Sequence, residues 1–294
     1  MQTVILEPKL SYTAAKKKWL NKELYDFQPK YMPTVDTFYR TPDGEAKLLF
    51  LKDVLDANVY DKCLPVLQGV KYTPAMNSRR ACLKGSPGGD ALFGYTDNLV
   101  YLPKKNRKQE HPELTAPSIH QWKRYRGMWP IVWKMEDALR DRFKDYWSGR
   151  EIGDERGPVY RPREQHSSFF GSPKEVEAWE DWEMFYSIPG SNFTSITVNW
   201  NTRFLGHTDA KNSDGALSCM ACWGTYRGGE LCFPRLDVAI AVGKRDMLVC
   251  DCPREMHGTL SPVQGTRYSI VVYTRQGLTK AGVKSKSVKA GMGW

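Results

Sequence analysis

Short runs of apolar or alternating residues, separated by turn signals, fill the chain from Phe193 onward. Runs of this length, rich in Val, Ile, Thr and aromatic residues, are typical of β-strands. No long helical pattern interrupts them. The pattern therefore predicts a jelly roll, or double-stranded β-helix, whose open mouth can hold a metal between two sheets. The predicted strands are residues 195–200, 217–223, 230–233, 238–242, 247–250 and 267–273.

Helical spacing is confined to the first half of the chain. Residues 11–27 and 131–147 place apolar residues on one face and charged residues on the other, which predicts amphipathic helices. Residues 48–59 predict a strand followed by a helix that begins near Asp53, an acceptable N-cap. We therefore expect an α+β protein in which N-terminal helices flank a jelly-roll core in the C-terminal half.

Gly, Pro and polar residues dominate the connections. Residues 72–97 and 149–171 have this composition and predict long loops, which in compact domains are usually functional or disordered. The pattern favours one domain over residues 1–294. Its expected parts are a helical and loop-rich support region at 1–185, the double-stranded β-helix core at 186–277 and a basic tail at 278–294.

Two histidines and an aspartate form the strongest chemical signal in the chain. His207 and Asp209 stand two residues apart, so in an extended segment both side chains point to the same side, and His257 comes from a late strand. Two imidazoles and one carboxylate are the ligand set of a mononuclear non-haem Fe(II) site, which leaves the opposite face of the octahedron open. The motif therefore predicts an iron centre.

Arg267 opens the last predicted strand, with Ser269 on the same face. A 2-oxoglutarate molecule that chelates the iron through its keto-acid end leaves a distal carboxylate, and a planar guanidinium neutralises that group with two parallel hydrogen bonds. We therefore expect Arg267 to anchor this co-substrate. Asn199 and Arg203 lead into the metal turn. They are equally compatible with contacts to the inner carboxylate of the co-substrate and with hydrogen bonds at the strand end.

Seven cysteines, an odd number, argue against a disulfide framework and suit a reducing compartment. A zinc site is the alternative, and it would use Cys219, Cys222, Cys250 and Cys252. A zinc-binding Cys-x-x-Cys normally sits on a tight turn, whereas residues 218–223 have no Gly or Pro and predict a strand. Buried, unreactive thiols are the favoured interpretation.

The net charge of +10 favours a polyanionic partner. Residues 122–129 interleave basic and aromatic side chains, which suits a backbone-binding groove and a solvated loop equally. The first residues lack the pattern of a signal peptide and no apolar stretch is long enough to span a membrane, so we expect an intracellular protein. Further cations lie between residues 79 and 126 and, in the tail, at Lys280, Lys284, Lys286 and Lys289.

Six short motifs stand in order within residues 187–275. They are Phe-Thr-Ser-Ile-Thr-Val-Asn (193–199), His-Thr-Asp (207–209), Gly-Gly-Glu-Leu (228–231), Asp-Met-Leu-Val (246–249), His-Gly (257–258) and Arg-Tyr-Ser (267–269). Together they resemble the catalytic core of Fe(II)/2-oxoglutarate dioxygenases. Within that superfamily they are most similar to the TET/JBP group, particularly to its fungal and phage-like members. Enzymes of this group oxidise the methyl group of 5-methylcytosine or thymine in nucleic acid.

This resemblance implies a function and a set of roles. Fe(II) would be held by His207, Asp209 and His257, and 2-oxoglutarate by Arg267 with help from Ser269. The enzyme would use O2 to oxidise 5-methylcytosine in DNA to 5-hydroxymethylcytosine, with the extent of further oxidation left open. The modified base would leave the stack to reach the metal, while the basic support region and tail would hold the phosphates.

Two residues bear on the choice of base. The resemblance implies that Asn212, three residues after the metal aspartate, hydrogen-bonds the flipped base, because an amide offers both a donor and an acceptor. Arg275 departs from the pattern, since relatives often have a histidine facing the base at that distance from the 2-oxoglutarate arginine. The departure leaves thymine or another modified base open as the substrate.

Two other functions also stay open. A protein hydroxylase of the prolyl type shares the His-x-Asp motif and the Gly-Gly-Glu-Leu turn, although such enzymes commonly use lysine in place of Arg267. A nucleic-acid-binding jelly roll with a vestigial site is the non-enzymatic alternative. We expect a monomer, located in the nucleus if the source is eukaryotic and in the cytoplasm if it is a phage or a bacterium.

Overall fold

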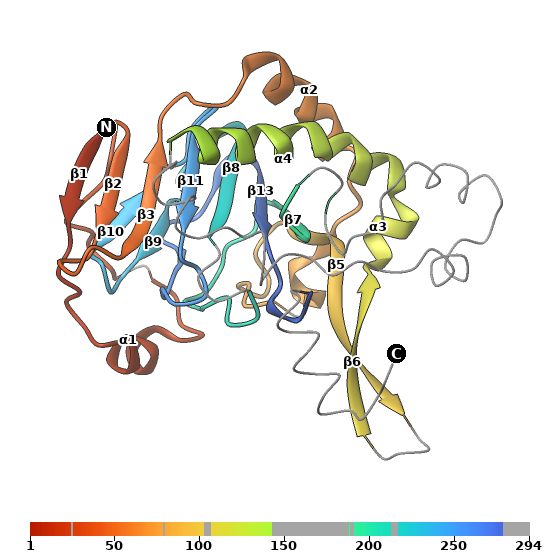
Figure 1. The fold of residues 1–294 in the computed structure, drawn as a ribbon, viewed down its shortest axis with the longest axis horizontal. Helices are drawn as coiled ribbons and strands as arrows, with labels where there is room; N and C mark the ends of the chain where they lie inside the picture. The colour runs from red at the N-terminus through yellow and green to blue at the C-terminus, as the bar shows by residue number, and fades with distance from the viewer. Residues whose placement is uncertain are drawn as a thin grey trace.

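Two β-sheets form the framework of the protein (Figure 1). The computed structural model describes residues 1–24, 26–78, 80–102, 107–142, 188, 191–212 and 217–278. The strands are β1 (Gln2–Ile5), β2 (Thr37–Arg40), β3 (Ala46–Leu51), β4 (Thr73–Pro74), β5 (Gly89–Leu102), β6 (Arg107–Leu114), β7 (Ser195–Trp200), β8 (Ser218–Arg227), β9 (Leu231–Phe233), β10 (Val238–Ile240), β11 (Met247–Cys250), β12 (Gly258–Thr259) and β13 (Gln264–Tyr273). The helices are α1 (Tyr12–Trp19), α2 (Ala57–Gln68), η1 (Ala75–Asn77), α3 (Ala116–His120), α4 (Trp122–Arg142) and η4 (Gln276–Leu278).

The larger sheet contains ten strands within the described residues, in the order β1-β2-β3-β11-β8-β13-β7-β5-β4, with β6 paired to β5. The smaller sheet has the order β10-β9-β12. Their strands pair antiparallel, except that β1 runs parallel to β2. The predicted α+β class with a double-stranded β-helix core is confirmed.

Alternation along the central strands sorts apolar side chains into two cores. On β11, Met247 and Val249 face one side of the sheet, and Leu248 and Cys250 face the other. The first side packs against α2 and α4, which lies along the large sheet in Figure 1, and the second packs against β9 and β10. No helix in the described part of the chain is long and apolar enough to cross a membrane.

The N-terminal half contributes more strand than the sequence predicted. β1, β2 and β3 extend the large sheet outward from β11, so the boundary placed at residue 186 does not divide the sheet. Residues 72–97, predicted as a long loop, contain β4, η1 and the first part of β5, so that prediction was wrong. Pairing of β5 with β7, from Gly89 opposite Trp200 to Gly94 opposite Ser195, outweighs the weak strand preference of the glycines.

Helix ends also differ from the predicted ones. α1 ends at Trp19 rather than near residue 27. α2 begins at Ala57 rather than near Asp53, because the Asp56 carboxylate caps it by accepting a hydrogen bond from the Val59 amide at 2.9 Å.

The basic and aromatic stretch at residues 122–129 is the first part of α4, which therefore begins before Pro130 and includes it. The rings of Trp122, Tyr125 and Trp129 pack edge-on against one another, with centroids 5.4–5.8 Å apart. Tyr125 is fully buried, so at least this face of the stretch is core and neither a nucleic-acid stacking surface nor a solvated loop. Residues 149–171 and the lysines of the tail lie outside the described residues.

Phe93 anchors β5 to the helical layer. It is fully buried, and its ring stacks on Tyr125 with centroids 6.0 Å apart. We expect Phe93→Ala to lower the free energy of unfolding by about 3–5 kcal/mol, because it leaves a cavity between β5 and α4. Urea unfolding followed by circular dichroism measures the loss. Met76→Ala is the control, since Met76 is 68% exposed and should shift the value by less than about 0.5 kcal/mol. Equal losses in the two variants would contradict the packing role.

Candidate metal centre and its pocket

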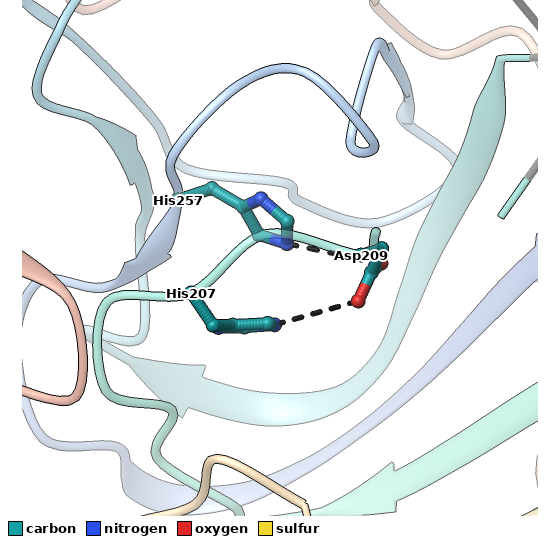
Figure 2. A group of neighbouring side chains, drawn as sticks. All are labelled: His207, Asp209 and His257. Atoms are coloured by element: carbon teal, nitrogen blue, oxygen red, sulfur yellow. Dashed lines mark ion pairs between the residues drawn. The ribbon is translucent and has the colours of Figure 1, made fainter. Parts of the chain in front are cut away.

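His207, Asp209 and His257 converge on one point between the two sheets (Figure 2). One ligand atom from each side chain lies within 4.8 Å of the other two. The Nε2 atom of His207 is 3.8 Å from Asp209 Oδ1, and that of His257 is 3.9 Å from Asp209 Oδ2. Such spacing leaves room for a cation that would replace these contacts with shorter bonds. Among the described residues, this is the group of His, Cys, Asp and Glu side chains that could hold a metal.

Backbone hydrogen bonds bring the two histidines together. The amide of His207 donates to the carbonyl of His257, and the amide of His257 donates to the carbonyl of His207, both at 2.9 Å. This bridge joins the segment after β7 to the residue before β12. Two ligands far apart in the sequence are thus fixed by the main chain, whatever their side chains bind.

Carbonyl groups also set the orientation of each imidazole. Nδ1 of His207 lies 2.8 Å from the carbonyl oxygen of Leu205, and Nδ1 of His257 lies 2.9 Å from that of Glu255. Because a carbonyl only accepts, each Nδ1 carries a proton, which leaves Nε2 as the atom of each ring that would bind a metal. The amide of Asp209 donates to the carbonyl of Cys252 at 3.0 Å, which holds the third ligand.

Burial and mutual proximity shift the pKa values of all three ligands. Burial and the neighbouring His257 lower the pKa of His207 to about 4, which keeps its imidazole neutral. Burial opposes ionisation of Asp209, but the two histidines and Arg80 outweigh it and lower the pKa of the carboxyl. Burial also lowers the pKa of His257, whereas Cys252 and Asp209 raise it, to about 10 overall. A divalent cation bound here would displace the proton of His257.

A pocket between the sheets opens onto this centre. β13 contributes Arg267, Ser269 and Val271, and β7 contributes Asn199. The remaining lining residues are Arg80, Phe204, Met220, Leu231, Cys250, Cys252 and Thr259. The pocket thus has a charged end, a metal-binding side and apolar walls.

Arg267 is a buried cation at one end of the pocket. Its residue is 7% exposed, and no carboxylate of the described residues forms an ion pair with it. Its Nη2 donates to the Cys222 sulfur at 3.4 Å, its guanidinium lies over the Tyr226 ring, and its Nε has no hydrogen-bond partner. Burying an unpaired charge is costly, so this site fits a ligand that brings its own carboxylate.

Asn199 and Ser269 form a polar pair in the same wall. The Asn199 Nδ2 donates to Ser269 Oγ at 3.2 Å, while Asn199 Oδ1 is buried and has no hydrogen-bond partner among the residues that the structure describes. A buried acceptor of this kind is normally satisfied by a donor on a ligand or by a bound water. The donor set and Arg267 together therefore fit Fe(II) with a dicarboxylate co-substrate.

Sequence comparison points to one group of proteins. No family model matches the chain. The thymine dioxygenase JBP1 of Crithidia fasciculata is 40% identical over 65 residues, which are 22% of this chain and 8% of that protein. The thymine dioxygenase JBP1 of Leishmania braziliensis is 30% identical over 97 residues, which are 31% of this chain and 12% of that protein. The chain thus matches only a small part of the length of these relatives.

Comparison of folds gives a match along nearly the whole chain. The structure of NgTET1 in complex with 5mC DNA superimposes with a TM-score of 0.51 at 12% sequence identity, covering 99% of this chain and 91% of that one. The chain is thus similar to JBP1 proteins over part of its sequence and shares the fold of NgTET1. The resemblance found in the sequence motifs is thereby confirmed.

Not every predicted site residue reaches the pocket. Arg203 forms an ion pair with Glu23 at 3.0 Å and donates to the Leu260 carbonyl at 3.4 Å, so its guanidinium is held away from the predicted co-substrate site. The strand-end alternative describes it better. Asn212 is buried outside the lining, with Nδ2 at 3.5 Å from both Asp209 Oδ2 and Ser218 Oγ.

Asn212 and Arg275 are neighbours on the far side of Asp209. A β-bridge pairs them, and the Arg275 amide donates to Thr194 Oγ1 at 2.9 Å. The Arg275 guanidinium lies over the Tyr273 ring, and its charge contributes to the lowered pKa of Asp209. Contacts of these two residues with a base remain a prediction.

Arg80 lines the pocket, although the sequence placed it in a basic region predicted to bind phosphates. Its Nη1 donates to Thr197 Oγ1 at 2.6 Å. That hydroxyl in turn lies 3.1 Å from the hydroxyl of Tyr273, so a chain of polar groups crosses the pocket wall. No spacing in the TET/JBP motifs could have revealed Arg80, because it reaches the site from a separate segment. Arg79 lies outside the described residues.

The four cysteines considered for zinc are all buried free thiols, as favoured. Cys219 and Cys222 lie on β8, the strand predicted at that position. Burial raises the pKa of the Cys219 thiol far above its usual value, so it is a weak nucleophile. Cys250 and Cys252 instead line the metal pocket.

Proposed function

We propose that this chain is an Fe(II)- and 2-oxoglutarate-dependent dioxygenase that oxidises the methyl group of 5-methylcytosine in DNA to 5-hydroxymethylcytosine. The observation that carries the proposal is one pocket with two features: a His-Asp-His centre and a buried arginine that has no acidic partner within the described part of the chain. The sequence similarity to JBP1 proteins and the fold shared with NgTET1, which is known in complex with 5mC DNA, support the substrate. The thymine dioxygenases among its relatives make thymine the alternative base.

The metal and co-substrate fit the residues described above. Bound Fe(II) with 2-oxoglutarate supplies the activation of O2 that hydroxylation of a methyl group needs. His207, Asp209 and His257 would hold the metal from one side. Arg267 would bind the distal carboxylate of 2-oxoglutarate, and Ser269 with Asn199 would orient the co-substrate between Arg267 and the metal.

The apolar walls have a separate task. Met220, Leu231 and Val271 line the same pocket as Arg267 and the metal ligands. They would exclude water from the reacting methyl group and strengthen the electrostatic contacts inside. The base would have to leave the duplex stack to enter, at a cost of a few kcal/mol that contacts in the pocket offset.

Arg80 stands where such a base would be bound. Its guanidinium donates only, so it suits the carbonyl oxygen or the unprotonated ring nitrogen of a pyrimidine. Arg275 and Asn212 would act from the side of Asp209. The net charge of +10 supports attraction of the DNA backbone, and cations near residues 79–126 would contribute to it.

We expect Arg80→Ala to weaken the binding of methylated DNA by about 10-fold or more, because the substitution removes a charge-assisted hydrogen bond to the base. The measurement is KM for a 5-methylcytosine duplex and Kd for the matching unmethylated duplex, each at two salt concentrations. Arg126→Ala, an exposed arginine on α4, is the control and should affect both duplexes alike. A loss in Arg80→Ala that is equal for both duplexes and shrinks at high salt would instead make Arg80 a phosphate contact.

Substrate choice is tested with a panel. The protein is incubated with Fe(II), 2-oxoglutarate and duplexes containing 5-methylcytosine, thymine or N6-methyladenine, and the nucleosides are analysed by mass spectrometry. We expect oxidised 5-methylcytosine to be the main product. Oxidised thymine alone would support the alternative base. Succinate formed only when proline-containing peptides are added, with no oxidised base, would favour a protein hydroxylase.

A further inference from the structure

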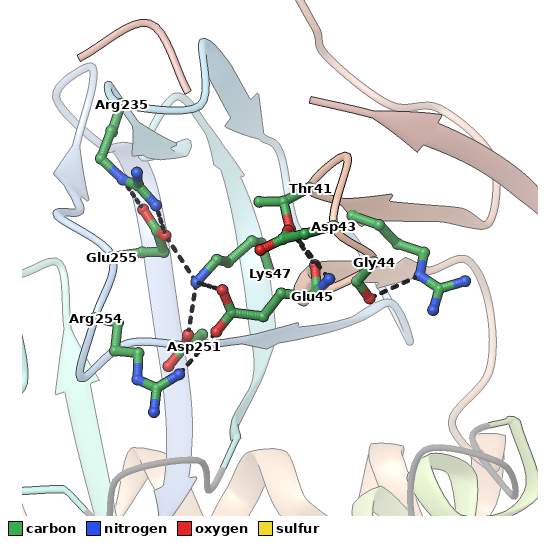
Figure 3. Close-up of polar contacts among 10 residues, drawn as sticks. Thr41, Asp43, Gly44, Glu45, Lys47, Arg235, Asp251, Arg254 and Glu255 are labelled. Carbon is green, nitrogen blue, oxygen red and sulfur yellow. Dashed lines mark hydrogen bonds and ion pairs between the residues drawn. The ribbon is translucent and has the colours of Figure 1, made fainter. Parts of the chain in front are cut away.

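Six charged side chains form a cluster next to the candidate metal centre (Figure 3). We call it the Lys47 cluster. Its members are Glu45, Lys47, Arg235, Asp251, Arg254 and Glu255. None of these side chains belongs to the metal-ligand motif or lines the pocket.

Lys47 lies at the middle of the cluster. Its side chain is 4% exposed, although it stands at the start of the apolar strand β3. Its Nζ is 3.0 Å from Glu45, 3.2 Å from Asp251 and 3.3 Å from Glu255. Burial alone would lower the pKa of Lys47, but these three carboxylates outweigh it and raise the pKa, so the ammonium group stays charged.

The remaining cations complete the charge balance. Arg235 donates to Glu255 through Nε at 2.8 Å and through Nη2, and Arg254 pairs with Glu45 at 2.7 Å. Three positive and three negative groups therefore neutralise one another. Because desolvating charges offsets much of their attraction, a buried network of this kind is weak support for stability alone.

The cluster holds a turn, residues 251–255, at both ends. The Asp251 amide donates to the Lys47 carbonyl at 3.1 Å, and the Glu255 amide donates to the Asp251 carbonyl at 2.8 Å. The ammonium group of Lys47 binds the side chains of the same two acids. Lys47 thus joins β3 to the first and last residues of this turn.

The same turn supports two of the three candidate metal ligands. Its Cys252 carbonyl accepts the amide of Asp209 at 3.0 Å. Its Glu255 carbonyl accepts from Nδ1 of His257 at 2.9 Å, the contact that sets the imidazole orientation. A movement of this turn would therefore shift both the carboxylate and the imidazole relative to His207.

We propose that Lys47 is a positioning residue for the metal centre: by clamping Asp251 and Glu255, it holds the turn whose carbonyls orient Asp209 and His257. The inference rests on the proposed function, because it assumes that these ligands bind a metal. Lys47 touches neither metal nor substrate. Partners that orient metal ligands typically contribute about 10- to 100-fold to metal affinity.

Co(II) binding tests the proposal without turnover. Titration of the apo protein with Co(II), followed by the visible absorption of the bound ion, gives both the Kd and the ligand geometry. We expect Lys47→Met to raise the Kd about 10-fold or more and to alter the absorption spectrum. Lys47→Arg keeps the charge, so it should recover most of the affinity and the wild-type spectrum.

Lys52→Met is the matched control. Lys52 directly follows β3, is 51% exposed in its side chain and pairs with Asp246 at 2.9 Å, away from the turn. Asp246 keeps hydrogen bonds from the amides of Asp53 and Gly243 in this variant, so we expect an unchanged Kd for Co(II).

If Lys47→Met does not fold, its affinity for Co(II) cannot report on the positioning role. The isosteric Glu255→Gln then carries the test, since it removes the charge that Lys47 binds and leaves the backbone carbonyl in place. A folded Lys47→Met or Glu255→Gln protein with a Kd within twofold of wild type and an unchanged spectrum would overturn the positioning role. Wild-type protein that binds no Co(II) would instead contradict the proposed function, and the positioning role with it.

Discussion

His257→Ala is expected to abolish turnover and metal binding. The variant keeps only one imidazole and one carboxylate, and two ligands rarely hold Fe(II) in a working geometry. We expect the Kd for Fe(II) to rise by more than about 100-fold, since losing a ligand costs more than losing a group that orients one. Isothermal titration with Fe(II) under anaerobic conditions and succinate formation under air measure the two effects.

The His257→Ala result can be separated from unfolding. The main-chain bridge between residues 207 and 257 does not involve the imidazole, so the variant should fold with a circular dichroism spectrum like that of the wild type. His120→Ala is the control, because His120 is an exposed histidine at the end of α3. Turnover retained in folded His257→Ala would remove the site assignment.

Arg267→Met is expected to raise KM for 2-oxoglutarate by about 100-fold or more. Truncating one partner of a buried, hydrogen-bonded charge pair typically costs 2–5 kcal/mol, and about 2.7 kcal/mol corresponds to 100-fold. Arg267→Lys should fall between wild type and Arg267→Met, because an ammonium group keeps the charge and loses the bidentate geometry. Succinate formation at varied 2-oxoglutarate concentrations gives these values.

Stability provides a second readout for Arg267→Met. The wild-type arginine is buried without an acidic partner among the described residues, so methionine should leave the free protein at least as stable. Added 2-oxoglutarate with Mn(II) should raise the melting temperature of the wild type and not that of the variant.

Arg227→Met is the control for this effect, since Arg227 is an exposed arginine on β8. A KM within twofold of wild type in Arg267→Met would mean that the co-substrate carboxylate binds elsewhere.

Local spacing made the centre of the site predictable. Arg267 and Ser269 stand two apart on β13, so strand geometry places both side chains on the face that lines the pocket. His207 and Asp209 also stand two apart and both line the pocket, although they lie in the segment between β7 and β8 and not on a strand. The strands after residue 193 were also predictable, because a sheet that is buried on both faces has strands of nearly continuous apolar sequence.

Other features depended on partners that are distant in the sequence. Arg80 lines the pocket although it comes from a separate segment of the chain, and no local pattern encodes this. Arg203 forms an ion pair with Glu23 and does not line the pocket, which is also not visible in the local sequence. Lys47 stands where an apolar residue is expected, and its burial makes sense only with Asp251 and Glu255 beside it. The glycines at the start of β5 resemble a loop until β7 is placed next to them.

The source of the product's oxygen atom is the most direct measurement of the proposed function. A 5-methylcytosine duplex is incubated with the protein, Fe(II) and 2-oxoglutarate under ¹⁸O₂, and the nucleosides and organic acids are analysed by mass spectrometry. We expect 5-hydroxymethylcytosine with ¹⁸O in its hydroxyl group, one succinate for each product molecule, and neither product with His257→Ala. Unlabelled DNA bases together with metal binding and no succinate would contradict the assignment of this pocket as a dioxygenase site.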